Sequence, residues 1–267
     1  MFYLIVARKS LIINPNLRKQ GEQMKRINPI IFPAITLLMA AGLIRLRDWQ
    51  LETGFDAQGI PVGGATTWLV LGLTAVAALL WLLLSLCVTP GKELTEGNGI
   101  AAGLTTLIGG LGLAAASALS IYGQRGDMMA SIADLLGILG GFCLCVSGAA
   151  RLKGRTLPSA LHILPYVAVM LRLISDFRAW SIDPIILDYC FRHFGLIFAM
   201  CALYCGASLS FGKGRRRLTA FWAMGGLCLC AMGSVKLPLT EALLYIGLTF
   251  VCLGILFQIT GTVPAEE

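Results

Sequence analysis

Residues 67–88 read TWLVLGLTAVAALLWLLLSLCV, a run of 22 residues without a charge. A bilayer hydrocarbon core about 30 Å thick is crossed by a helix of roughly 20 apolar residues, so this run is long enough to span it. Backbone exposed to lipid must satisfy its hydrogen bonds internally, which a helix does. The run therefore predicts a helical membrane protein.

Other apolar stretches show the same pattern, separated by short polar breaks. With residues 67–88 they give eight predicted spans, at about 29–46, 67–88, 100–122, 131–150, 157–177, 184–211, 218–235 and 238–260. The composition agrees: 57% of the 267 residues are hydrophobic and 13% are charged, against about 45–50% and 25% in soluble proteins. The predicted fold class is all-α, a polytopic membrane protein built as a bundle of about eight transmembrane helices.

The positions of the lysines and arginines predict the orientation. Cytoplasmic loops of membrane proteins carry an excess of these residues. With the N-terminus inside, 14 of them fall in inner segments and 5 in outer segments. Both termini are therefore predicted to be cytoplasmic, in a multi-pass protein of the plasma membrane. The net charge of +7 follows from this distribution, and no nucleic-acid partner is expected.

The chain divides into three predicted parts: a basic cytoplasmic segment at 1–27, the transmembrane domain at 28–262 and a short cytoplasmic tail at 263–267. The apolar run Met1–Ala7 is too short to cross a membrane. Two interpretations of the beginning remain. Residues 1–14 lie in the membrane interface as a basic amphipathic segment, or the true start is Met24, which two basic residues follow. We favour the second.

Small residues predict which helices touch. The span at 100–122 carries Gly110, Ala114 and Ala118 at four-residue spacing, and the span at 131–150 carries Gly137 and Gly141. Small residues four apart let two helix backbones approach closely in a membrane. We expect these two spans to pack against each other.

Four of the ionisable residues inside the predicted spans matter most, and all four lie toward the outer side: Asp134, Arg172, Asp188 and Arg192. Each costs roughly 2.5–3.5 kcal/mol to insert, so each needs a partner or a function. For Asp134 the segment Ser131–Asp134 resembles a capping box, in which the carboxylate would bind free backbone N–H groups at a helix start.

The other charges form two pairs at i,i+4 spacing, Arg172 with Asp176 and Asp188 with Arg192. A short loop joins their helices, so the pairs should be neighbours. With His193 they form the predicted substrate-binding set: Arg172, Asp176, Asp188, Arg192 and His193. This set predicts an outward-facing polar vestibule for a small charged or zwitterionic solute. The alternative is that each arginine merely neutralises its carboxylate, or that Arg172 extends to the headgroups.

The function class is therefore predicted to be a transporter or permease-like protein. The alternative is a non-catalytic scaffold or a subunit of a membrane complex. No zinc-protease, nucleophile-elbow or phosphate-loop motif occurs, so we expect no enzyme. A third hypothesis is an intramembrane enzyme that uses a carboxylate, a histidine and an arginine for acid–base chemistry.

Cofactors and metals are not expected. The nine cysteines all fall in apolar runs and resemble small buried hydrophobic residues, and the two histidines, His162 and His193, are predicted to lie at different depths. The bilayer itself is the main expected partner. The basic cluster Lys213–Arg217 is expected to bind anionic lipid headgroups on the inner face.

Overall fold

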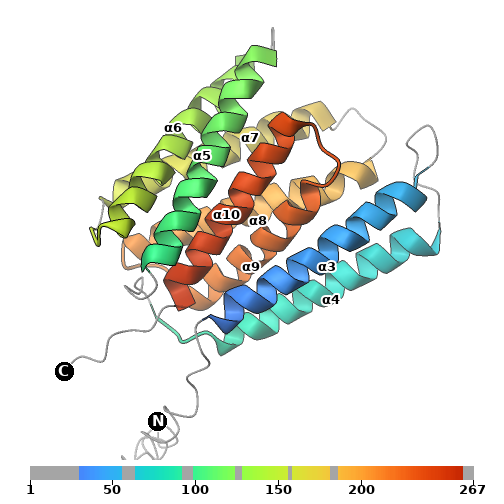
Figure 1. The fold of residues 1–267 in the computed structure, drawn as a ribbon, viewed down its shortest axis with the longest axis horizontal. Helices are drawn as coiled ribbons and strands as arrows, with labels where there is room; N and C mark the ends of the chain where they lie inside the picture. The colour runs from blue at the N-terminus through green and yellow to red at the C-terminus, as the bar shows by residue number, and fades with distance from the viewer. Residues whose placement is uncertain are drawn as a thin grey trace, which may run out of the picture.

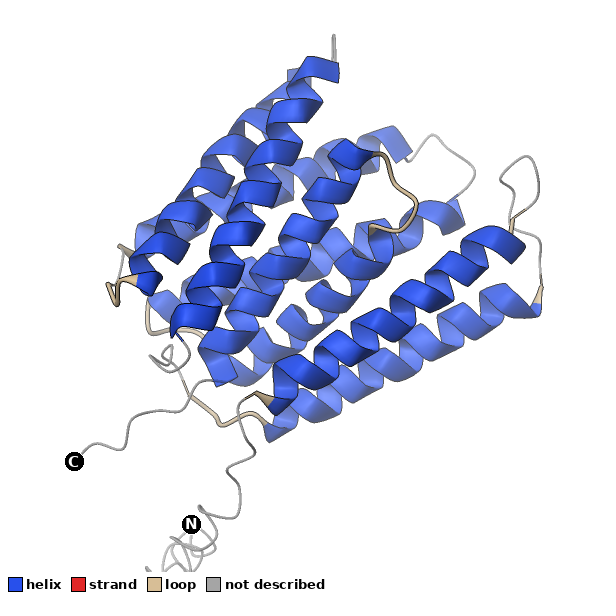
Figure 2. Cartoon of the chain, viewed as in Figure 1, coloured by secondary structure: helices blue, strands red, loops and turns tan. Residues whose placement is uncertain are grey.

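The computed structural model describes residues 30–55, 64–91, 99–123, 128–155, 158–180 and 186–260, with the backbone alone at 179–180 and 186–189. Eight α-helices and one 3-10 turn make up this part of the chain: α3 (Ile31–Thr53), α4 (Ala65–Cys87), α5 (Gly99–Gly123), α6 (Met128–Leu152), η1 (Ser159–His162), α7 (Ile163–Trp180), α8 (Ile186–Ser210), α9 (Arg216–Gly233) and α10 (Leu239–Thr260). They run back and forth through one bundle (Figures 1 and 2). The predicted all-α bundle of about eight helices is confirmed.

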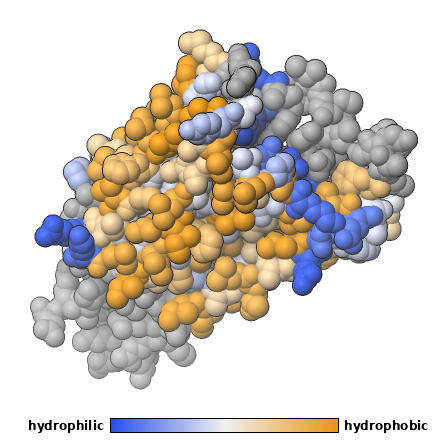
Figure 3. Space-filling view, turned by 45° about the horizontal axis from the view of Figure 1, so that its top comes forward, coloured by the Kyte–Doolittle hydropathy of each residue, from blue (hydrophilic) through white to orange (hydrophobic). Residues whose placement is uncertain are grey.

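Six of these helices are long and apolar enough to cross a membrane: α4, α5, α6, α7 with its preceding turn, α8 and α10. The other two helices, α3 and α9, carry charged residues near one end. α3 has Arg45, Arg47 and Asp48 near its end, and α9 begins with Arg216 and Arg217. Apolar residues cover most of the visible face of the molecule (Figure 3). The chain is a multi-pass helical membrane protein.

Close backbone contacts fix α5 between α6 and α10. A Cβ atom built on Gly110 would lie 2.7 Å from Gly141 O, and one built on Gly141 would lie 2.7 Å from Gly110 O. On its other side α5 meets α10, where a Cβ on Gly109 would lie 2.7 Å from Gly247 O. The predicted packing of residues 100–122 on 131–150 is confirmed. Gly109 and Gly247 allow a similar close approach of the backbones of α5 and α10.

The helix α9 is enclosed by protein. It packs against α3, α4, α8 and α10, and 14 of its 18 residues are buried. Trp81 of α4 is fully buried, with its ring edge-on to Phe198 of α8 at 6.1 Å. Neighbouring helices, rather than lipid, therefore form most of the surroundings of α9.

The end of α3 corrects the predicted end of the first span. The sequence predicts that this span ends at about residue 46, yet the helix continues to Thr53. Arg47 is 2% exposed and donates a hydrogen bond from Nη1 to Gln50 Oε1 at 2.6 Å, and its guanidinium lies 5.2 Å from the Phe191 ring centroid. Contacts with an amide and an aromatic ring stabilise the buried cation, so the helix does not end where the charges begin.

Several sequence predictions lie outside the described residues. These are the N-terminal segment at 1–27 with its two interpretations, the tail at 263–267, and the first two residues of the predicted span at 184–211. The other predicted spans agree with the observed helices to within a few residues.

The first residues of α3 and the last residues of α10 lie at the same end of the bundle (Figure 1). The loop after α6 and the loop after α8, which carry Arg151, Lys153, Arg155 and the segment Lys213–Arg217, are at this end as well. It is therefore the end that the charge distribution predicts to be cytoplasmic.

A pair of reporter fusions tests this orientation. Alkaline phosphatase, active only outside the cytoplasm, should be inactive when fused after Thr260 and active when inserted after Gly123, at the opposite end of the bundle. Green fluorescent protein in the same two positions is the matched control, with fluorescence expected after Thr260. An active phosphatase after Thr260 would contradict the predicted orientation.

Candidate functional site

Arg172 lies in the middle of α7 and joins two helices through its guanidinium. Its Nη1 donates a hydrogen bond to Asp134 Oδ1 of α6 at 2.9 Å. Its Nε is 2.9 Å from Asp176 Oδ1 and 3.1 Å from Asp176 Oδ2, one turn along α7. The predicted pair of Arg172 with Asp176 is confirmed. Arg172 is 17% exposed, so it is held inside the bundle and does not extend to the membrane surface.

Asp134 corrects the prediction of a helix cap. The helix α6 begins at Met128, so Asp134 lies in its second turn, about 9 Å of helix from the start. The side chain is 1% exposed and binds Arg172. The apolar residues before Ser131 continue the helix, and a buried carboxylate is stabilised more strongly by a guanidinium than by backbone N–H groups at a helix end.

A second arginine meets an acid that the sequence analysis missed. Arg192 Nη1 of α8 lies 3.5 Å from Glu241 Oε2, in the first turn of α10. The predicted span at 238–260 contains Glu241, but the sequence analysis assigned it no role. One signal was available: Pro238 favours a helix start just after it, which places Glu241 and Tyr245 one turn apart on one helix face.

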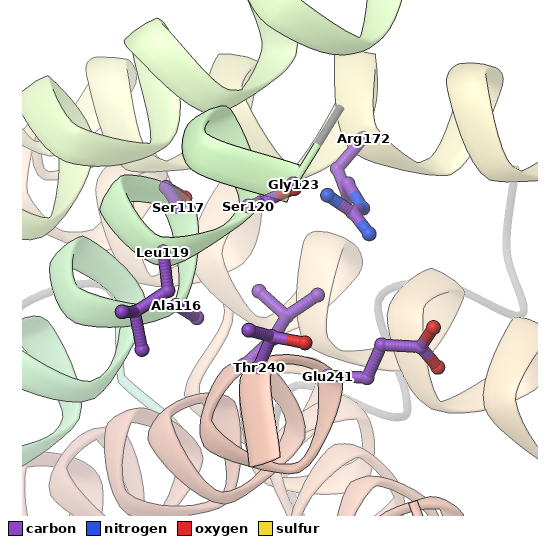
Figure 4. A pocket seen from close by; sticks show the side chains of 9 residues that line it. Ala116, Ser117, Leu119, Ser120, Gly123, Arg172, Thr240 and Glu241 are labelled. Atoms are coloured by element: carbon purple, nitrogen blue, oxygen red, sulfur yellow. The ribbon is translucent and has the colours of Figure 1, made fainter. Parts of the chain in front are cut away.

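A cavity of about 150 Å³ opens beside these charges. Its walls come from α5, α7 and α10: Ala116, Ser117, Leu119, Ser120, Gly123, Arg172, Thr240, Glu241 and Leu244. In Figure 4 the guanidinium of Arg172 points from α7 into this space, and Thr240 and Glu241 lie across from it on α10. One cation, one carboxylate and three hydroxyl groups therefore line the cavity.

Two buried polar atoms beside the cluster have spare hydrogen-bonding capacity. Within the part of the chain that the structure describes, Asp134 Oδ2 and the Tyr245 hydroxyl have no hydrogen-bond partner. Tyr245 is 2% exposed and lies near the charges of Arg172, Asp176 and Arg192. Buried polar groups are nearly always paired, so both atoms retain unused hydrogen-bonding capacity, although neither residue is among those that line the cavity.

The structure brings together part of the predicted binding set. Arg172 and Asp176 are in contact, and Arg192 approaches the same cavity through Glu241. His193 lies against the exposed ring of Phe177, 5.4 Å between ring centroids, and does not line the cavity. The side chain of Asp188 lies outside the described residues.

A smaller polar group lies at the other end of the same helices. Ser147 Oγ of α6 is 3.2 Å from His162 Nε2 of η1. Both residues line a cavity of about 30 Å³, together with Thr106, Arg151 and Gln258. The sequence analysis assigned no role to His162.

Among the described side chains, the charges around Arg172 and Arg192 do not cancel. Arg172 and Arg192 face Asp134, Asp176 and Glu241, so the described side chains in contact there carry one more acid than base. Charges inside a membrane protein normally pair or face a water-filled cavity. This arrangement can offer a guanidinium and a carboxylate to one small molecule at the same time.

Comparison with known proteins adds no family to these observations. No family model matches the chain, and neither a curated protein nor a solved structure matches it. The function proposed below therefore rests on the residues of this chain.

Proposed function

We propose that the protein is a transporter or permease-like protein of the plasma membrane that binds a small zwitterionic or charged solute in its outer cavity. The observation that carries the proposal is that Arg172 and Glu241 line one cavity of about 150 Å³. An acidic group of the solute would meet Arg172, and a basic group would meet Glu241. Ser117, Ser120 and Thr240 would orient the solute through hydroxyl groups.

The size of the cavity favours a solute of amino-acid dimensions. Sites for drug-sized molecules have volumes of about 300–1,000 Å³, well above the 150 Å³ found here. The excess of one carboxylate in the cluster favours a solute that carries a positive group over a simple anion. A small amino acid combines both properties.

A row of cavities along one seam supports transport rather than binding alone. Below the outer cavity, a space of about 10 Å³ is bordered by Leu113, Leu196, Leu244 and Arg172. The cavity that contains His162 follows at the inner end, between α5, α6, α8 and α10. A transporter opens a path alternately to each side of the membrane. Such a path needs a polar cavity at each end and an apolar layer between them.

Solute binding is tested by thermal unfolding of the purified protein with small amino acids, small carboxylates and small amines. We expect an amino acid to raise the unfolding midpoint more than either single-charge class. Glu241→Gln should weaken that binding about tenfold or more, because it removes a charge-assisted contact of roughly 1.5–3 kcal/mol. Uptake of the same amino acid into vesicles should fall in parallel.

A matched control is available at the same end of the bundle. Glu52→Gln changes an exposed glutamate of α3 that pairs with Lys236 at 3.0 Å, away from the cavity. If Glu241→Gln and Glu52→Gln have equal effects, or no solute class shifts the midpoint, the transport proposal is wrong.

One observation favours a second candidate function, a non-catalytic scaffold or subunit. Arg172 already binds two carboxylates, as it would if it served only to join α6 and α7. In that case solutes would leave the unfolding midpoint unchanged, and substitutions at Arg172 would affect stability alone. Neither candidate assigns the protein an enzymatic reaction.

A further inference from the structure

A large open groove lies between α4 and α9 at the end predicted to be cytoplasmic. Its volume is about 760 Å³, and its walls are Leu82, Ser85, Leu86, Pro90, Gly91, Arg215, Arg216, Arg217, Leu218 and Phe221. It is distinct from the outer cavity, with which it shares no lining residue. Leucine and phenylalanine side chains form one part of the groove, and three consecutive arginines form the other.

The shape of the groove is fixed by contacts between the two segments that border it. Arg216 N donates a hydrogen bond to Gly91 O at 3.2 Å, and Arg217 Nε donates one to Val88 O at 3.0 Å. Arg216 is 7% exposed, whereas Arg215 and Arg217 are exposed. The bond from Nε orients the guanidinium of Arg217, and its two terminal nitrogens remain able to bind an anion.

Apolar walls and a cationic rim match the two parts of a phospholipid. Leu82, Leu86 and Leu218 are 48%, 53% and 46% exposed. Arginine binds phosphate groups through several N–H donors at once. The cytoplasmic leaflet is the one that carries anionic lipids in most cells, and basic pockets between helices on that side bind their headgroups.

We propose that this groove is a binding site for one anionic glycerophospholipid. Arg215 and Arg217 bind its phosphate, and an acyl chain lies along Leu82, Leu86 and Phe221. None of the described residues that line the groove is acidic, so the field at the rim favours an anionic headgroup over a zwitterionic one. The site goes beyond the proposed transport function and does not depend on it.

Native mass spectrometry of the full chain tests the site. The detergent-purified protein is equilibrated with an equimolar mixture of phosphatidylglycerol and phosphatidylcholine, and the retained lipids are counted. We expect the wild type to retain phosphatidylglycerol preferentially. Arg215→Gln/Arg217→Gln should lower this preference about tenfold, which equals about 1.4 kcal/mol. The matched control, Lys153→Gln/Arg155→Gln, removes two exposed charges at the same end outside the groove and should keep the preference.

A second variant tests the acyl-chain part without changing charge. Leu86→Trp fills the groove and should reduce retention of phosphatidylglycerol, whereas Leu83→Trp, an exposed position on α4 outside the lining, should not. Because Leu86→Trp keeps every arginine, it remains decisive if the double arginine variant fails to fold. Excess glycerol phosphate, which has the headgroup chemistry without acyl chains, should not displace the bound lipid.

Three outcomes would overturn the proposal. Equal retention of the two lipids by the wild type would show that the groove does not select anionic lipid. Equal losses in the two charge variants would show diffuse attraction to the basic end rather than a site. Displacement by glycerol phosphate, or unchanged retention in Leu86→Trp, would show that the apolar walls do not bind the lipid.

Discussion

Replacing Arg172 by methionine should destabilise the folded protein by about 3–5 kcal/mol, the usual cost of removing one partner from a buried ion pair. The reason is the position of Asp134, which is 1% exposed and whose one hydrogen-bonded oxygen accepts from Arg172. Without the guanidinium, the carboxylate would be a buried charge without compensation. The thermal unfolding midpoint of the purified protein, followed by tryptophan fluorescence, measures the loss.

A double variant separates this cause from a simple loss of packing. Arg172→Met/Asp134→Leu removes the two charges that join α6 to α7, and replacing a buried pair by apolar side chains of similar volume is often neutral or stabilising. We expect the double variant to recover part of the stability lost by Arg172→Met, because Asp176, which also pairs with Arg172, still lacks its partner. Arg178→Met, an exposed arginine on the same helix, should change stability little. If the double variant were less stable than the single one, the pairing of Asp134 would not be the cause.

Adding one methyl group at the contact between α5 and α6 should have the second large effect. Gly110→Ala and Gly141→Ala each place a Cβ 2.7 Å from a backbone oxygen of the facing helix. A backbone cannot move aside as a flexible side chain can, so the helices must separate. Each substitution should destabilise the protein by about 1–3 kcal/mol, the range found for overpacked cores.

The chain offers matched controls for these two glycines. Gly42 of α3 and Gly72 of α4 also lie within helices, and a Cβ at either position would meet nothing within 4 Å. There alanine should be neutral or stabilising by up to about 1 kcal/mol, because it favours a helix more than glycine does. Unfolding midpoints of the four variants test the contrast. Equal effects at all four positions would contradict the close approach of α5 and α6.

The sequence was sufficient to predict most of the fold, because membrane spans depend on local composition. A run such as residues 67–88 predicts a helix without any knowledge of its neighbours, and α4 is observed at Ala65–Cys87. The main error, the end of α3, has the opposite origin. Arg47 is stabilised by Phe191, which is distant in sequence, so no local pattern could indicate that the helix continues through it.

The difference between local contacts and contacts distant in sequence also explains which parts of the candidate site were predicted. Arg172 and Asp176 lie one turn apart on one helix, so their contact follows from spacing alone. The contacts of Arg172 with Asp134 and of Arg192 with Glu241 join residues 38 and 49 positions apart. They depend on which helices are neighbours and on how each is rotated about its axis. The spacing of residues along one sequence indicates neither which helices are neighbours nor how each helix is rotated.

The enclosure of α9 has a consequence for how the protein is made. A segment that the translocon releases into lipid must normally be apolar enough to partition there alone, and α9 is not among the helices that reach this level. Its neighbours α3, α4 and α8 leave the ribosome before it, but α10 follows after it. We therefore expect the nascent α9 to enter the bilayer by assembling with helices already inserted, and to be secured there only when synthesis of α10 is complete.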